Sequence, residues 1–137
     1  MYSFFLDTSF LIALEFQSDQ YHRQAREMWI DISTKNPKLV TTSFIFNEIV
    51  THINSRKHHQ VALKIGNDLL QSASIKLVHV DEALFTEGWK YLQTHKDKTY
   101  SMTDCISFVV MKKLELTTAL TFDKHFVQAG FITIPEC

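Results

Sequence analysis

The sequence predicts an α/β fold in which a mostly parallel central sheet of four to five strands is flanked by layers of helices. Short apolar segments alternate with amphipathic helical segments along the chain, a pattern typical of parallel strands joined by helical crossovers. A hydrophobic content of 45% over 137 residues is enough to build one packed core. We therefore expect residues 1–137 to form a single domain.

The first half of the chain contains two strand-like segments and three helical ones. Apolar residues at helical spacing predict the helices, and short runs of apolar or β-branched residues predict the strands. The Asn36-Pro37 pair is a break between elements. The expected order is a buried strand over 2–6, a helix from Thr8, a helix over 21–33, a strand over 39–41 and a helix over 43–55.

The second half continues the alternation. We expect a helix over 60–71, a strand over 75–80, a helix opened by Asp81, a helix over 101–114, a strand over 118–122 and a short strand over 131–134. The helix over 101–114 is almost wholly apolar beyond its first turn, so we expect it to be buried. Trp29 and Trp89 lie at helical spacing among apolar neighbours, and we assign both to the core.

Cysteine usage and hydropathy limit the class of protein. Cys105 and Cys137 form neither a zinc-type pair nor a disulfide framework. No apolar run approaches the roughly 20 residues that cross a bilayer, and the first residues lack the pattern of a secretory leader. We expect a cytoplasmic protein without membrane attachment.

The net charge of −1 does not suggest a strongly basic nucleic-acid binder. The distribution of the charges, however, is compatible with a partly basic surface. When the four acids discussed next are set aside, fourteen basic side chains face eleven acidic ones, which permits a mildly basic surface around an acidic site.

Four acids come from separate segments that approach one edge of the predicted sheet: Asp7, Glu48, Asp104 and Asp123. Ligands of open parallel sheets bind outside the carboxyl ends of the strands. The flanking residues of all four acids are apolar, and carboxylates near a core are costly to desolvate unless they are paired or bind a metal.

Each acid also has a structural explanation when taken alone. Asp7 and Asp123 could cap the helices that follow them, and Asp104 could form a capping box with Ser101. A lone helical acid such as Glu48 is usually a solvated surface residue. Capping, however, does not explain the apolar flanks.

Convergence of the four acids would require a counterion. Two like charges ~4 Å apart, at an effective dielectric constant of ~20, repel by roughly 4 kcal/mol. A divalent cation would offset this repulsion, and an all-oxygen ligand set favours Mg²⁺ or Mn²⁺ over Zn²⁺.

Four motifs resemble those of PIN domains, in the same order and over nearly the whole chain. Cys105 stands where a small alanine is frequent in that family. The motifs are Leu6-Asp7-Thr8-Ser9-Phe10-Leu11-Ile12, Thr42-Ser43 with Asn47-Glu48-Ile49, Ser101-Met102-Thr103-Asp104-Cys105-Ile106-Ser107, and Leu120-Thr121-Phe122-Asp123-Lys124-His125-Phe126 with Ala129-Gly130-Phe131.

The resemblance implies a PIN-like three-layer fold and a Mg²⁺- or Mn²⁺-dependent endoribonuclease that hydrolyses RNA phosphodiester bonds. It also implies the VapC-like toxin branch of type II toxin-antitoxin systems, with a small antitoxin as partner and a homodimeric state. The implied catalytic and metal-holding residues are Asp7, Glu48, Asp104 and Asp123, with supporting hydroxyls from Ser9, Ser101 and Thr121.

The sequence gives weaker evidence for residues, other than the acids, that would contact RNA. Arg56 and Lys57 are candidate phosphate contacts, although a charged run of this length is more often a solvated face.

Other functions stay open at this point. The chain could be a stand-alone PIN nuclease in RNA processing, a nuclease with histidine acid–base catalysis, or a non-catalytic metal-binding, receiver-like interaction module. An aspartyl-phosphate phosphatase is a further alternative, but that family has a second Asp where this chain has Ser9.

Overall fold

Five parallel strands form the centre of the molecule in a computed structural model that describes residues 2–137. The strands run in the spatial order β3-β2-β1-β4-β5, and each is hydrogen-bonded to its neighbours. Their bounds are β1 Ser3–Leu6, β2 Lys38–Thr42, β3 Ile75–Val78, β4 Thr118–Leu120 and β5 Ile132–Ile134. The predicted α/β fold with a mostly parallel sheet is confirmed, and every strand pair is parallel.

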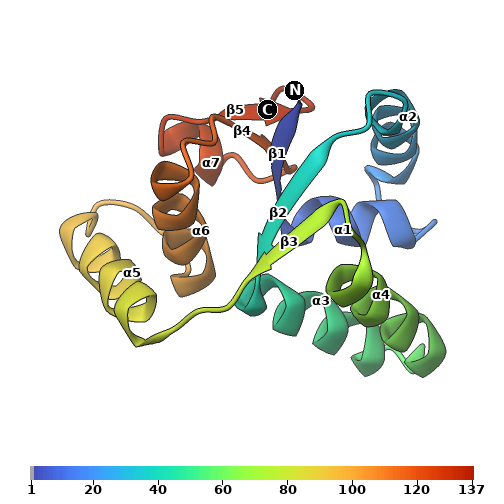
Figure 1. The fold of residues 1–137 in the computed structure, drawn as a ribbon, viewed down its shortest axis with the longest axis horizontal. Helices are drawn as coiled ribbons and strands as arrows, with labels where there is room; N and C mark the ends of the chain where they lie inside the picture. Colours follow the sequence, from blue (N-terminus) through green and yellow to red (C-terminus); the bar gives the residue numbers. More distant parts are fainter. Residues whose placement is uncertain (1) are drawn as a thin grey trace.

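Within the described part of the chain, seven helices flank this sheet: α1 Thr8–Glu15, α2 His22–Ser33, α3 Ser43–Ser55, α4 His59–Gln71, α5 Glu82–Thr94, α6 Met102–Lys113 and α7 His125–Gln128. Figure 1 shows α1 to α4 on one side of the sheet and α5 to α7 on the other. Among residues 2–137, none of the helices combines the length and the apolarity that crossing a membrane requires.

The strand order changes direction at β1. From β1 the chain first adds β2 and β3 along one side, then returns and adds β4 and β5 along the other. In open parallel sheets, ligands bind at the carboxyl ends of the strands where the order reverses. The backbone amide of Asp7 donates to the carbonyl of Leu120 at 3.1 Å, so the ends of β1 and β4 are joined at this point.

Helix α6 is the most deeply buried helix, as its composition predicts. Seven of its residues are buried, among them Phe108 and Met111. Helix α5 packs closely on it, because a Cβ atom at Gly88 would lie only 2.4 Å from Cδ1 of Ile106.

Three details differ from the prediction, the first being that strand β3 ends at Val78 rather than at Val80. The assignment of Trp89 to the core is wrong: its side chain is 50% exposed, because α5 packs on α6 through the face that holds Leu84 and Gly88, from which Trp89 is rotated away. Trp29 is partly buried against the core. Strand β4 also ends at Leu120 rather than at Phe122, because the Thr121 hydroxyl accepts a hydrogen bond from the amide of Asp123 and turns the chain.

Candidate active site

The four acids singled out in the sequence line one groove of about 360 Å³ at the carboxyl ends of β1 and β4. Asp7 directly follows β1, and Asp123 lies in the turn after β4. Glu48 lies in the second turn of α3 and Asp104 in the first turn of α6. Segments more than a hundred residues apart thus bring their carboxylates to a single place.

Asp7 is the most enclosed of these acids, with 5% of its surface exposed. It stands at the N-cap position of α1, yet among the described residues its carboxylate does not cap that helix. Its Oδ2 instead accepts hydrogen bonds from the Ser9 hydroxyl at 2.8 Å and the Thr121 hydroxyl at 2.7 Å. Capping therefore does not account for the position of this side chain.

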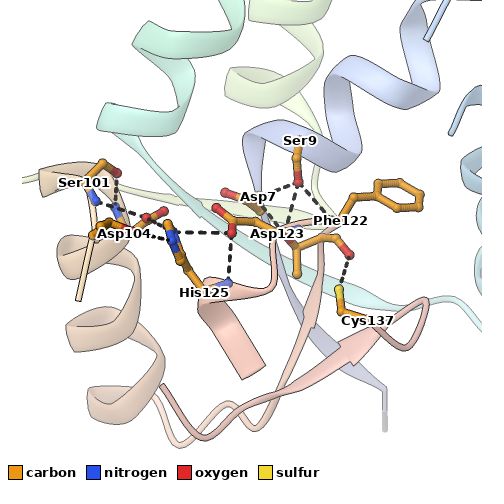
Figure 2. Close-up of polar contacts among 10 residues, drawn as sticks. Asp7, Ser9, Ser101, Asp104, Phe122, Asp123, His125 and Cys137 are labelled. Atoms are coloured by element: carbon orange, nitrogen blue, oxygen red, sulfur yellow. Dashed lines mark hydrogen bonds and ion pairs between the residues drawn. The ribbon is translucent and has the colours of Figure 1, made fainter. Parts of the chain in front are cut away.

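The two hydroxyls also join the acid of β1 to the turn that follows β4 (Figure 2). Their oxygens are 3.1 Å apart. Ser9 accepts from the amide of Phe122 and Thr121 from the amide of Asp123, both at 2.9 Å. This network fixes where Asp123 lies relative to Asp7.

Asp104 serves two purposes. It forms a complete capping box with Ser101: each side chain accepts from the other residue's amide, at 3.1 and 3.0 Å. The structural explanation considered for Asp104 is therefore correct, but it is incomplete. The same Oδ2 that caps α6 lies 3.0 Å from Nδ1 of His125 inside the groove.

His125 is one of two residues of the groove whose roles sequence reasoning missed. Its Nδ1 lies 3.0 Å from Asp104 and 3.4 Å from Asp123. One donor atom from each of Asp104, Asp123 and His125 can lie within 4.8 Å of the other two, a spacing compatible with one metal ion. The signal was the Asp-x-His spacing, because the Asp123 carboxylate accepts from the amide of His125 at 2.9 Å and so places the two side chains together.

Glu48 lies at the rim of the groove. Its side chain is exposed and accepts a hydrogen bond from the Thr8 hydroxyl at 2.8 Å. Thr8 directly follows Asp7. The segment after β1 therefore carries one acid, Asp7, and orients a second acid, Glu48, through the Thr8 hydroxyl. Thr8 had no role in the sequence prediction.

Burial and the charges of neighbouring acids raise the pKa values of Asp7 and Asp104. Burial raises the pKa of Asp7 to about 6; hydrogen bonds from Thr121 and Ser9 oppose this shift, and the charges of Asp104 and Asp123 add to it. Burial likewise raises the pKa of Asp104, and Asp123 adds to that rise. A cation would relieve both costs, and carboxylate oxygens with one imidazole suit a divalent ion.

Arg56 and Lys57 lie at the far end of α3, eight and nine residues beyond Glu48 and so about 12 Å along the helix. Both are exposed. Arg56 contacts Nδ1 of His52 at 3.1 Å, and its guanidinium lies 5.9 Å from the ring centre of Phe16. They are not among the described residues that line the carboxylate groove, so their contact with RNA stays a prediction.

Comparisons with known proteins agree with this architecture. The PIN domain family model matches residues 4–132. The chain is 34% identical over 133 residues to the 23S rRNA-specific endonuclease VapC20 of Mycobacterium tuberculosis, covering 96% of this chain and 98% of that protein. The crystal structure of VapC20, described as a sarcin-ricin loop cleaving toxin, has a TM-score of 0.84 at 32% identity and covers 94% of this chain and 96% of VapC20.

More distant structures share the fold. FitAcB from Neisseria gonorrhoeae has a TM-score of 0.64 at 17% identity, covering 95% of each chain. VapBC2 from Rickettsia felis, bound to a DNA fragment from its promoter, has a TM-score of 0.61 at 14% identity, covering 96% of each chain. The predicted PIN-like fold is confirmed, and the chain belongs to the PIN-domain family, among its VapC-like endoribonucleases.

Proposed function

We propose that this protein is a metal-dependent endoribonuclease that hydrolyses RNA phosphodiester bonds as the toxin of a toxin-antitoxin pair. The observation that carries the proposal is the single groove that Asp7, Glu48, Asp104 and Asp123 all line. The identity of 34% to a 23S rRNA-specific endonuclease along nearly the whole of both chains supports the same class of substrate.

Asp7, Asp104 and Asp123 are the residues that would hold the cation, with Glu48 as a direct or water-linked fourth. Their oxygen-rich donor set favours Mg²⁺ or Mn²⁺. When bound, such an ion offsets negative charge on the phosphate and favours deprotonation of a water molecule.

The chain's own residues prepare this site before RNA arrives. Ser9 and Thr121 hold the Asp7 carboxylate, and Ser101 holds that of Asp104. Such fixed side chains avoid reorganisation during the reaction. Glu48 is exposed at the rim and is suited to accept a proton from the attacking water, with Thr8 orienting it.

The substrate we propose is the sarcin-ricin loop of 23S ribosomal RNA, the loop that the related VapC20 is described as cleaving. This substrate would place the protein in the cytoplasm with the ribosomes. A small antitoxin that covers the groove, and a homodimeric state, complete the proposal.

A cleavage assay tests the function directly. Purified protein is incubated with 23S rRNA and Mg²⁺ or Mn²⁺, and new 5′ ends are mapped. We expect one main cut, its loss with a chelator, and its return when the ion is restored. Asp7→Asn should abolish cleavage.

Asp81→Asn is the matched control. Asp81 also follows a strand and caps a helix, accepting from the amide of Leu84 at 2.8 Å, and Asn is an equally good cap. Asp81→Asn should cut at the wild-type rate. Cleavage that persists in Asp7→Asn or in the absence of divalent ions would refute the proposed mechanism.

A further inference from the structure

A second and larger groove, of about 840 Å³, adjoins the carboxylate groove. The two grooves share Ser9, Ile12 and Asp123 among the residues that line them. A strand of RNA whose phosphodiester lies at the carboxylates therefore passes directly by the larger groove. The mechanism proposed above makes no use of it.

Three aromatic rings form a column that leads from the core to this groove. Phe10 is fully buried, and Phe122 stacks on it with ring centres 5.8 Å apart and planes 9° apart. Tyr21 stacks on Phe122 at 4.5 Å and 6°. Tyr21 is the outermost ring and is 38% exposed. Phe122 and Tyr21 both line the larger groove.

Hydrogen bonds hold the backbone on both sides of the outer ring. The amide of Tyr21 donates to the Asp19 carboxylate at 2.8 Å, and Nδ1 of the adjacent His22 lies 2.8 Å from the carbonyl of Ala13 in α1. The amide of Phe122 donates to Ser9, the residue that holds Asp7. A short chain of contacts thus ties Tyr21 to the carboxylate site, and a preorganised surface loses little entropy when it binds a ligand.

Most of the other polar lining residues suit a nucleobase better than a phosphate, because among the described residues the carboxylates of Asp19, Asp123 and Glu136 outnumber the one ammonium group, that of Lys124. Gln20 and Gln24 offer amide donors and acceptors, and Asp19 and Glu136 offer carboxylates that accept from base N–H groups and repel phosphates. Unpaired bases are commonly recognised by stacking on an aromatic ring together with hydrogen bonds to their edges.

We infer that the larger groove binds an unpaired nucleobase of the RNA next to the cleaved phosphodiester, with the Tyr21 ring as its stacking partner. This inference rests on the proposed ribonuclease function, because it requires RNA at the carboxylates. It assigns substrate selection to the α1–α2 turn, outside the motifs that carry the acids.

The test measures whether the effect of removing the Tyr21 side chain depends on the presence of one particular base. Wild-type protein and Tyr21→Ala are assayed on a synthetic sarcin-ricin hairpin and on hairpins with a single abasic nucleotide at each position around the cut. At one position we expect the abasic change to lower the wild-type kcat/KM about tenfold, as expected for a lost stacking contact. Tyr21→Ala should show a similar loss on the intact hairpin and no further loss at that position.

Two variants separate stacking from a general loss of structure. Tyr21→Phe keeps the ring and should restore both the rate and the sensitivity to the abasic nucleotide. Tyr2→Ala is the matched control: Tyr2 is 51% exposed and stacks on Phe4, but it precedes β1 and so lies at the opposite end of the strands. It should behave as wild type.

The results of the hairpin assay test the inference about Tyr21 separately from the proposed ribonuclease function. If wild-type protein cuts neither the hairpin nor 23S rRNA, the proposed function fails and the inference fails with it. If wild-type protein cuts but the effects of Tyr21→Ala and every abasic nucleotide are independent, the inference is wrong and the ribonuclease function stands.

Discussion

The hydroxyl of Thr121 lies 2.7 Å from the carboxylate of Asp7, although 114 residues separate them in the chain. The contact exists because β1 and β4 are neighbours in the sheet and end at the same level. Thr121 is fully buried and also accepts the amide hydrogen of Asp123. One side chain thus positions two acids of the site.

Thr121→Val tests this relationship. The substitution leaves the buried amide of Asp123 without its acceptor and leaves Oδ2 of Asp7 with the Ser9 hydroxyl as its one remaining donor, so we expect a loss of about 1–3 kcal/mol in the free energy of unfolding. It also removes a hydrogen bond that lowers the pKa of Asp7, and we expect RNA cleavage to fall at least tenfold. Thr121→Ser keeps the hydroxyl and should retain most of both properties, measured by denaturant titration and by the cleavage assay.

Asp7→Asn should stabilise the metal-free protein at neutral pH. Burial raises the pKa of Asp7 from 3.8 to about 6, so the folded state holds a proton that the unfolded state releases, and stability falls as the pH rises from about 4 to 6. A shift of this size corresponds to roughly 3 kcal/mol. Asn lacks the charge and can still accept from Ser9 and Thr121.

Thermal unfolding in a chelator gives the measurement. The advantage of Asp7→Asn should be full above pH 6 and absent below about pH 4, where the wild-type carboxyl is protonated in both states. If Asp7→Asn is less stable than the wild type at pH 8, the ionised Asp7 carboxylate does not destabilise the folded state.

Metal binding should raise the melting temperature of the wild-type protein. An ion present at 100 times its Kd stabilises the folded state by about 2.7 kcal/mol. The increase should be large with Mn²⁺ or Mg²⁺ and largely lost in Asp104→Asn, whereas Asp81→Asn should respond like the wild type. Equal shifts in all three proteins would place the ion elsewhere on the surface.

His125→Ala should weaken metal binding without unfolding the protein. The imidazole lies within 3.4 Å of both Asp104 and Asp123, and loss of a residue that orients metal-holding side chains typically costs 10- to 100-fold in affinity. Calorimetric titration with Mn²⁺ measures this change. His125→Asn retains a donor near the position of Nδ1 and should recover part of the affinity; unchanged affinity in His125→Ala would exclude the positioning role.

The sequence was sufficient to predict the order of the elements, because each is short and strongly patterned. Helix α3 was predicted with its observed bounds, since Ile45, Ile49 and Ile53 mark one buried face between two polar ends. Trp89 was misplaced because periodicity identifies an apolar face but not whether another element covers it.

The details of the site depend on contacts across the sheet. The contact between Thr8 and Glu48 joins residues 40 positions apart, and that between His125 and Asp104 joins residues 21 apart. Local spacing contains no information on either pair. The acids could be singled out because their apolar flanks are a local feature, and the family resemblance implied the supporting hydroxyls of Ser9, Ser101 and Thr121. The contacts of Thr8 and His125 are recognisable only once β1, α3, β4 and α6 are in place.

Asp104 and Asp7 differ in how the fold depends on them. Asp104 completes the capping box of α6, so an inactivating substitution there whose side chain cannot accept from the Ser101 amide also removes on the order of 1 kcal/mol of folding stability. Asp7 contributes no such cap, and its replacement by Asn relieves a buried charge. In cells that survive toxicity by mutating this gene, well-folded inactive protein should therefore arise more readily through position 7 than through position 104.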